Sequence, residues 1–231
     1  MPPPDPAPAC RDVAAALAAH GLSVRGGFAP LGEDVVPEAA PGVPARALVL
    51  VGNTGGAMWR NFAPHIDGAP HPLDRWTRAV VGPIAEALGA RAVFPFEAPP
   101  LPFQRWAKRA EGLSSSPLGL LVHPVYGLWH AYRAALLFPV EIADLPTVPA
   151  EPSPCESCRE RPCLSACPVG AFGEGGYDVP ACASRLRAPG GHRCRSSGCL
   201  ARDACPVGRE HRYPPEQVAF HMSAFRRALG A

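Results

Sequence analysis

Cysteines are crowded into one short stretch of this chain. Eight of the nine lie between Cys155 and Cys205, in a sequence of 231 residues. The pentapeptide Ala-Cys-Pro-Val-Gly occurs twice in this stretch, at 166–170 and at 204–208. Thiols at such close spacing suit metal binding or a disulfide framework. This array is therefore the strongest constraint on how the C-terminal third folds.

The spacing of the cysteines predicts two [4Fe–4S] clusters. Each iron of such a cluster needs one soft terminal ligand besides its bridging sulfides, so two clusters need eight thiolates. Small residues beside the thiols allow close backbone approach and amide hydrogen bonds to sulfur. The expected ligands are Cys155, Cys158, Cys163, Cys167, Cys182, Cys194, Cys199 and Cys205.

Proline follows the last cysteine of each run. Pro168 and Pro206 lack an N–H and bias the preceding residue toward an extended backbone, so Cys167 and Cys205 should point away from their own runs. Each would then bind the cluster of the other run. The predicted crossed sets are Cys155, Cys158, Cys163 and Cys205 for one cluster, and Cys167, Cys182, Cys194 and Cys199 for the other.

Other uses of these cysteines stay open. Two zinc sites would also use eight thiolates, and Cys155-x-x-Cys158 is a common zinc half-knuckle, although zinc modules rarely duplicate Ala-Cys-Pro-Val-Gly. A disulfide framework belongs to secreted chains. A thioredoxin-type pair is disfavoured because Cys155 follows a Pro-rich linker and not a strand-to-helix turn. We expect an iron–sulfur protein, with a structural zinc-binding interaction protein as an alternative.

We expect a cytoplasmic protein without a membrane partner. We expect residues 1–8 to form a flexible lead, and they lack the basic and long apolar segments of an export signal. The longest stretch without Asp, Glu, Lys or Arg runs from Gly112 to Tyr132, and prolines, serines and histidines interrupt it.

The charges are unevenly divided along the chain. Residues 1–150 carry 11 basic and 12 acidic side chains, whereas residues 151–231 carry 11 arginines, no lysine and 8 acidic side chains. Two oxidised clusters would add about four negative charges, so the arginines are better explained as counter-charge than as a nucleic-acid patch. We therefore do not expect nucleic acid as a partner.

The N-terminal half alternates strand-like and helix-like segments. After a helix at 12–20, the apolar run 45–52 predicts a buried strand that ends in a glycine turn, followed by a helix at 57–62. Asp74 predicts the cap of another helix up to Gly89, before a strand at 92–96.

This pattern predicts an α+β chain in three parts, and 231 residues can hold one medium and one small domain. They are an α/β domain with a ligand pocket over 1–145, a dicluster ferredoxin-like domain over 151–213 and a C-terminal helix over 214–231.

Aromatic and imidazole side chains are densest between Ser116 and Phe138. Here His123, Tyr126, Trp129 and Arg133 are candidates for lining an aromatic-walled cavity. The alternative, which residue chemistry alone favours, is a core strand or turn followed by a helix in which the aromatic residues pack.

Two stretches resemble known families. The array with its isolated Cys182 and Cys-Pro-Val-Gly-Ala from Cys167 resembles the two-cluster ferredoxin domain of epoxyqueuosine reductases and reductive dehalogenases. The segment His-Pro-Val-Tyr-Gly-Leu-Trp-His-Ala-Tyr-Arg at 123–133 looks like a stretch of cobalamin-processing (CblC-type) proteins. These families share a nitroreductase-like cobalamin-binding fold. The resemblance implies a smaller version of that fold. It also implies a corrinoid bound against His123, Tyr126, Trp129 and Arg133.

The chain also departs from the family pattern. Four residues separate Cys158 from Cys163 where the family usually has two, and no helical-repeat module follows the cluster domain, which disfavours tRNA as substrate. We expect an electron-transfer protein whose clusters relay single electrons to a redox partner protein or to a cofactor in the N-terminal domain. A cobalamin-dependent or cobalamin-processing reductase is the alternative, and no catalytic residue is assigned.

Overall fold

Two compact units make up the computed structural model, which describes residues 9–146, 148, 152–173 and 175–230. The first unit consists of Met1–Gly112 with Ala131–Ala150, and the second of Leu113–His130 with Glu151–Ala231, each as far as it is described. Both contain helices and strands, which confirms the predicted α+β class. The predicted domain ranges assign 113–130 to the N-terminal part and stay a prediction, and the lead at 1–8 lies outside the described residues.

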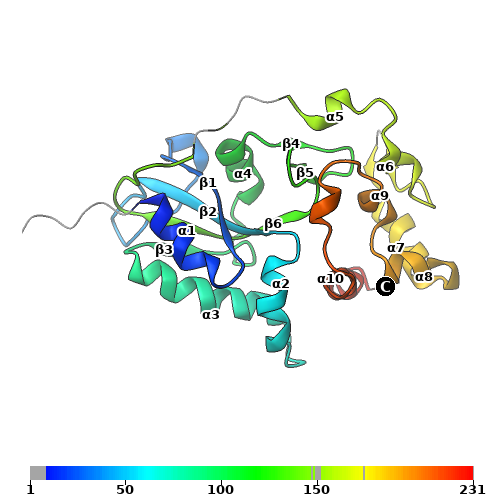
Figure 1. Cartoon of the computed structure of the whole chain (residues 1–231), viewed down its shortest axis with the longest axis horizontal. Helices are drawn as coiled ribbons and strands as arrows, with labels where there is room; N and C mark the ends of the chain where they lie inside the picture. Colours follow the sequence, from blue (N-terminus) through cyan, green and yellow to red (C-terminus); the bar gives the residue numbers. More distant parts are fainter. Residues whose placement is uncertain (1–8, 147, 149–151, 174, 231) are drawn as a thin grey trace, which may run out of the picture. The chain divides into compact units, whose positions relative to one another are not determined.

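A four-stranded sheet with the order β1-β2-β6-β3 organises the first unit (Figure 1). β1 pairs antiparallel with β2, and β3 pairs antiparallel with β6. The two central strands carry the apolar runs 48–51 and 134–138, whose side chains are fully buried. Such continuous runs are typical of strands covered on both faces. The strands are β1 (Ser23–Phe28), β2 (Ala47–Thr54), β3 (Arg91–Val93) and β6 (His130–Phe138).

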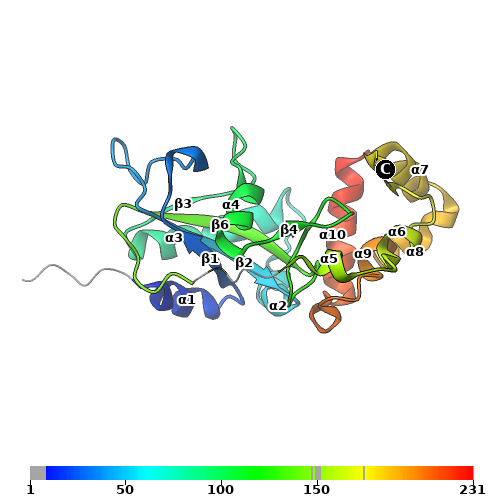
Figure 2. The same cartoon turned by 90° about the horizontal axis from the view of Figure 1, so that it is seen from above.

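Helices cover both faces of this sheet. α1 (Cys10–Ala18) and α3 (Pro72–Ala87) lie on one face, and α4 (Phe103–Glu111) lies on the other (Figure 1 and Figure 2). α2 (Ala57–Phe62) follows β2 directly, and the 3₁₀ turns η1 (Gly32–Asp34) and η2 (Ala63–His65) complete the unit. The core therefore lies between the sheet and the apolar sides of these helices.

Apart from its last helix, which has 14 residues, the elements of the second unit have nine residues or fewer. α10 (Pro215–Ala228) packs against α8 (His192–Ser196), and α6 (Pro162–Ser165) packs against α9 (Leu200–Asp203). Its hairpins are β4 (Ser114–Ser115) with β5 (Leu121–Val122) and β7 (Phe172–Gly173) with β8 (Gly176–Tyr177). Its helices are α5 (Pro154–Ser157), α6 (Pro162–Ser165), α7 (Val179–Arg187), α8 (His192–Ser196), α9 (Leu200–Asp203) and α10 (Pro215–Ala228), with η3 (Pro189–Gly191) and η4 (Arg209–His211).

The structure corrects one predicted element. Residue chemistry alone favours a core strand or turn followed by a helix within 116–138, but residues 130–138 form the strand β6 in the middle of the sheet. Ala and Leu favour helices, and here the position between β2 and β3 overrides that preference. The helix expected to be capped at Asp74 begins instead at Pro72, whose ring suits the first helical position.

The other predicted elements are confirmed within a few residues. The helix at 57–62 has the predicted bounds, and the predicted strands at 45–52 and 92–96 correspond to β2 and β3. The predicted helix at 12–20 corresponds to α1. Within the described residues, no helix combines the length and the apolar character that crossing a bilayer requires.

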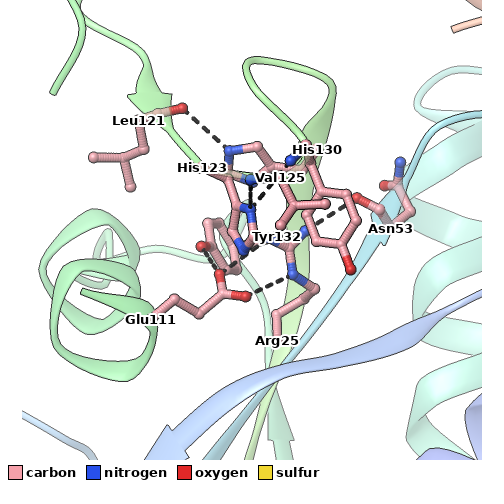
Figure 3. Close-up of polar contacts among 9 residues, drawn as sticks. Arg25, Asn53, Glu111, Leu121, His123, Val125, His130 and Tyr132 are labelled. Atoms are coloured by element: carbon pink, nitrogen blue, oxygen red, sulfur yellow. Dashed lines mark hydrogen bonds and ion pairs between the residues drawn. The ribbon is translucent and has the colours of Figure 1, made fainter. Parts of the chain in front are cut away.

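A buried ion pair connects α4 to the sheet (Figure 3). Arg25 of β1 is 2% exposed, and its Nε and Nη2 donate to the two carboxylate oxygens of Glu111 at 2.8 and 3.1 Å. Tyr132 of β6 donates its hydroxyl to the same carboxylate. Burial, and then the neighbouring Glu111 carboxylate, raise the pKa of Tyr132, so its hydroxyl remains a donor. Charge-assisted bidentate bonds of this kind are among the strongest in proteins.

Replacing Glu111 by Gln should lower the free energy of unfolding by about 3–5 kcal/mol, because it leaves the buried Arg25 without its carboxylate. Urea unfolding followed by fluorescence measures this. The control is Asp67→Asn, which breaks an exposed ion pair with Arg75 and should barely move the midpoint. Equal midpoints for the two variants would contradict a stabilising role for Glu111.

Candidate metal centre

One cavity in the second unit is lined by a complete predicted set of four thiols. Its empty volume is about 410 Å³, part of which is open to solvent. Burial raises the pKa of the Cys155 and Cys163 thiols, and the nearby Cys205 thiol adds to the effect on both. The structure thus places Cys205 beside a run that lies far from it in sequence. The four lining thiols are those of Cys155, Cys158, Cys163 and Cys205.

Apolar side chains form most of the remaining cavity wall. Leu118, Val122 and Leu128 come from the segment 113–130 and are buried in one small core with Ala201 and Cys205. Additional charge is poorly solvated among such groups. The other apolar lining residues are Pro117, Pro154, Pro162, Pro206 and Val207.

Arg202 connects the segment 113–130 to the cysteine-rich part of the unit. Its Nε and Nη2 donate to the carbonyl oxygen of Leu128 at 3.1 and 2.5 Å. Its guanidinium carbon lies 4.4 Å from the ring centre of Trp129 and 4.8 Å from that of Tyr213. Such stacking of a cation on aromatic rings is attractive. Because Arg202 lies on α9 between Cys199 and Cys205, these contacts help to position both thiols.

Two glycines allow a close backbone approach next to Cys205. A Cβ atom on Gly127 would lie 2.0 Å from the carbonyl oxygen of Val207, and one on Gly208 would lie 2.3 Å from the carbonyl carbon of Tyr126. Both glycines have positive φ, at 54° and 68°. Larger residues therefore fit neither the backbone conformation nor the space. The last glycine of the first pentapeptide, Gly170, would meet nothing within 4 Å.

Three thiols of the second predicted set lie close enough together to affect the pKa of one of them. Burial raises the pKa of the Cys199 thiol, and the neighbouring Cys182 and Cys167 add to this effect. Cys182 lies on α7, and the half-buried Cys194 lies on α8, which contacts α7. The structure thus brings Cys167, Cys182 and Cys199 together and places Cys194 on an adjacent helix.

A backbone N–H group reaches one of these thiols, since Ala171 donates to Cys167 Sγ at 3.3 Å. Such a bond stabilises a thiolate and its negative charge. Burial, and then the neighbouring Cys182, raise the pKa of Tyr177, so its hydroxyl stays protonated.

The described His, Cys, Asp and Glu side chains include no group of three or more arranged for a single metal ion. A tetrahedral zinc site needs four ligands converging on one ion. The thiolates of a [4Fe–4S] cluster instead bind four different irons.

His123 and Tyr126, two of the predicted corrinoid contacts, lie together in the second unit. Their ring centres are 4.3 Å apart, and the His211 ring lies 4.9 Å from that of Tyr126. Nδ1 of His123 accepts the backbone N–H group of Val125 at 3.0 Å (Figure 3). It also accepts that of Tyr126 at 3.2 Å. In the neutral ring the proton is then on Nε2, which acts as a donor and not as a metal ligand.

Trp129 and Arg133 have other surroundings. Trp129 is 4% exposed and packs against Arg202 and Tyr213 in the second unit. Arg133 belongs to the first unit, where its Nε donates to Oδ1 of Asn53 at 2.9 Å. Asn53 is fully buried near the C-terminal end of β2.

The sequence did not single out individual roles for Arg202 and Tyr177. In the sequence, Arg202 is one of 11 arginines in residues 151–231. Only its position between Cys199 and Cys205 indicates a role near the thiols. For Tyr177, the signal was an aromatic residue five positions before the isolated Cys182, at the edge of a glycine-rich hairpin.

Gly127→Ala should lower the free energy of unfolding by about 1–3 kcal/mol more than Gly119→Ala, because only the first adds a clash. Both glycines have positive φ, and Gly119 has open space around it. Urea unfolding of the two variants makes the comparison. Equal destabilisation would show that the contact at Val207 is not tight.

Comparisons with known proteins relate the fold to two kinds of protein. No family model matches the sequence, and no curated protein matches it. A crystal structure of epoxyqueuosine reductase is similar at a TM-score of 0.51 and 17% identity, over 90% of this chain and 68% of that one. A second, with an epoxyqueuosine-modified tRNA-Tyr stem loop, has a TM-score of 0.51 and 16% identity, over 90% and 69%.

The B12-trafficking protein CblC of C. elegans is similar over 95% of this chain and 92% of its own, at a TM-score of 0.51 and 18% identity. At such identities the similarity concerns the fold alone. The chain therefore has a fold similar to those of epoxyqueuosine reductases and CblC.

Proposed function

We propose that this chain is an iron–sulfur electron-transfer protein whose second unit binds two [4Fe–4S] clusters through the crossed thiol sets. Its role is to relay single electrons to a partner protein or to a cofactor bound by the first unit. The observation that carries this proposal is the cavity in which Cys205 joins Cys155, Cys158 and Cys163. Uncrossed ligation would instead group Cys205 with the second run.

The donor set fits such a cluster. Thiolates are the soft ligands that iron in a cubane takes, and the apolar wall of Leu118, Val122 and Leu128 limits contact with water. When bound, each cluster takes up or releases one electron. The residues of the chain hold the thiols in place, exclude water and donate hydrogen bonds to sulfur.

The architecture of the second unit also supports this proposal. Its short helices surround a small apolar core, and small units of this kind are commonly stabilised by metal ligation. The fold similarity to epoxyqueuosine reductases is consistent with an iron–sulfur protein. Because one of those structures holds a tRNA stem loop, our expectation against nucleic acid stays a prediction.

Iron counts in paired cysteine variants should distinguish crossed from uncrossed ligation. Protein purified without oxygen should hold about eight irons. Cys155→Ser with Cys205→Ser removes two ligands from one cluster and should leave about four irons. Cys155→Ser with Cys167→Ser removes one ligand from each cluster and should impair both.

Uncrossed ligation reverses these two outcomes, and a colourless protein with two zinc ions would overturn the proposal itself. The matched control is Cys10→Ser, which should keep the full iron count. Cys10 is buried in the first unit, and burial with the nearby Asp144 raises the pKa of its thiol.

A second candidate function is corrinoid binding. The similarity to CblC over nearly the whole of both chains favours it, as does the close pair of His123 and Tyr126 rings, 4.3 Å apart. With its Nδ1 occupied, His123 would contact a corrinoid through its ring face or its Nε2 proton and would not ligate cobalt.

Tyr126→Ala should weaken corrinoid binding at least tenfold if the ring is a contact, since losing a buried aromatic contact costs about 1.5–3 kcal/mol. The change in the absorption spectrum of added hydroxocobalamin measures binding. An unchanged spectrum with the native protein would rule this function out. Trp129→Ala is a poorer probe, because Trp129 supports Arg202 and its loss should also destabilise the second unit.

A further inference from the structure

The positive charge of the second unit is concentrated around its second predicted thiol set. The segment 179–202 contains three of the four cysteines of that set, and it carries five arginines and no Asp or Glu. The segment 217–231 carries two more arginines and again no acidic residue. By contrast, the loop 156–162 between cysteines of the first set carries two arginines and two glutamates, so it is neutral.

The helices α7, α8 and α10 bring these arginines together (Figure 1 and Figure 2). α8 packs against both α7 and α10. Arg187, the last residue of α7, donates from Nη1 to the carbonyl oxygen of Gly230 at 3.3 Å, just beyond α10. Arg195 of α8 donates to the carbonyl oxygens of Leu186 and Ala188 at 2.7 and 2.8 Å. These bonds hold the ends of the three helices next to one another.

We call these side chains the arginine surface. They come from three helices that carry no acidic residue between 179 and 202 or after Glu216. A bound cluster would add about two negative charges beside six arginines, so the surface would stay positive. Its members are Arg185, Arg187, Arg193, Arg195, Arg226 and Arg227.

Three members of the arginine surface are exposed and lack an acidic partner. Within the described residues, Arg187, Arg193 and Arg227 form no ion pair with an acidic side chain, whereas Arg212, elsewhere in the unit, pairs with Asp203 at 2.9 Å. Cations near the C-termini of helices stabilise those helices. That role does not require acidic residues to be missing from the whole surface, so the unpaired charge is available to a partner.

An acidic redox protein suits this surface. Complementary charges steer two proteins toward each other and raise association rates by about 10 to 10³. Guanidinium groups bind carboxylates through two parallel hydrogen bonds. Contacts between electron-transfer proteins are small, below about 1,200 Å², so three neighbouring helices can provide the area. Because Cys182 lies on α7 and Cys194 on α8, a protein docked there would lie beside the second cluster.

A nucleic acid suits the arginine surface less well. Proteins that bind single strands and RNA loops combine positive charge with aromatic side chains on which the bases stack. The segment 179–202 contains no Phe, Tyr or Trp. An RNA bound over these helices would also cover the cluster that has to exchange electrons.

Building on the proposed function, we infer that the arginine surface docks an acidic redox protein, which exchanges a single electron with the cluster bound by Cys167, Cys182, Cys194 and Cys199. When the partner is the donor, its redox centre loses one electron and is oxidised. The second cluster gains that electron and is reduced, and no bond is made or broken.

Stopped-flow reduction of the iron-loaded protein tests this inference. The probe is an acidic plant-type [2Fe–2S] ferredoxin, reduced beforehand without excess reductant. The absorbance change that accompanies electron transfer gives the second-order rate constant. For the native protein, this constant should fall at least tenfold between about 0.01 M and about 1 M salt, because the Debye length shrinks from about 30 Å to about 3 Å.

Charge reversal on the arginine surface should remove the rate advantage. At low salt, Arg193→Glu should lower the rate constant about threefold, and adding Arg187→Glu should bring the loss to about tenfold. At high salt, these variants and the native protein should react alike. The matched control is Arg159→Glu. Arg159 is exposed and adjoins the predicted ligand Cys158, as Arg193 adjoins Cys194, but it lies outside the surface and should have less than about a twofold effect.

Three results would overturn this inference while leaving the proposed function intact. They are native rates that do not depend on salt, an equal loss in Arg159→Glu and Arg193→Glu, and weaker binding of an RNA stem loop by Arg193→Glu with unchanged reduction by ferredoxin. Native protein without iron would overturn the proposed function instead. Iron content, measured on every variant, separates a lost cluster from impaired docking.

Discussion

The attachment of the segment 113–130 to the cysteine-rich chain is the constraint on which the rest of the second unit depends. Arg202 makes this attachment by bonding the Leu128 carbonyl and stacking on Trp129 and Tyr213. Through it, Leu128 and its neighbours become a wall of the cavity that the first four thiols line. The surroundings of that thiol set therefore depend on a contact made by a residue that is not a ligand.

The duplicated pentapeptide serves two different structural purposes. In the second copy, Gly208 meets the backbone at Tyr126, where a side chain has no room. In the first copy, Gly170 stands in open space, and the chain continues into the hairpin that carries Tyr177. The same pentapeptide thus lies at a tight backbone contact in its second copy and beside open space in its first.

Much of the fold could be predicted from local sequence, but the contacts around the thiols could not. The apolar run at 45–52 predicted a buried strand because its hydrophobicity leaves no other stable position. The composition of 130–138 favours a helix, and the prediction there was wrong. These residues form β6 because they pair with strands that are distant in sequence. Cysteine spacing predicted the ligand sets, whereas the contacts of Arg202 depend on folded geometry that spacing does not encode.

The central claim is that two [4Fe–4S] clusters lie close together in one unit. Electron paramagnetic resonance of the fully reduced native protein, with iron and sulfide counted on the same sample, tests it most directly. The account predicts about eight irons, about eight sulfides and a spectrum broadened by the interaction of two reduced clusters. A protein without iron, or a signal from one isolated cluster with about four irons, would contradict it.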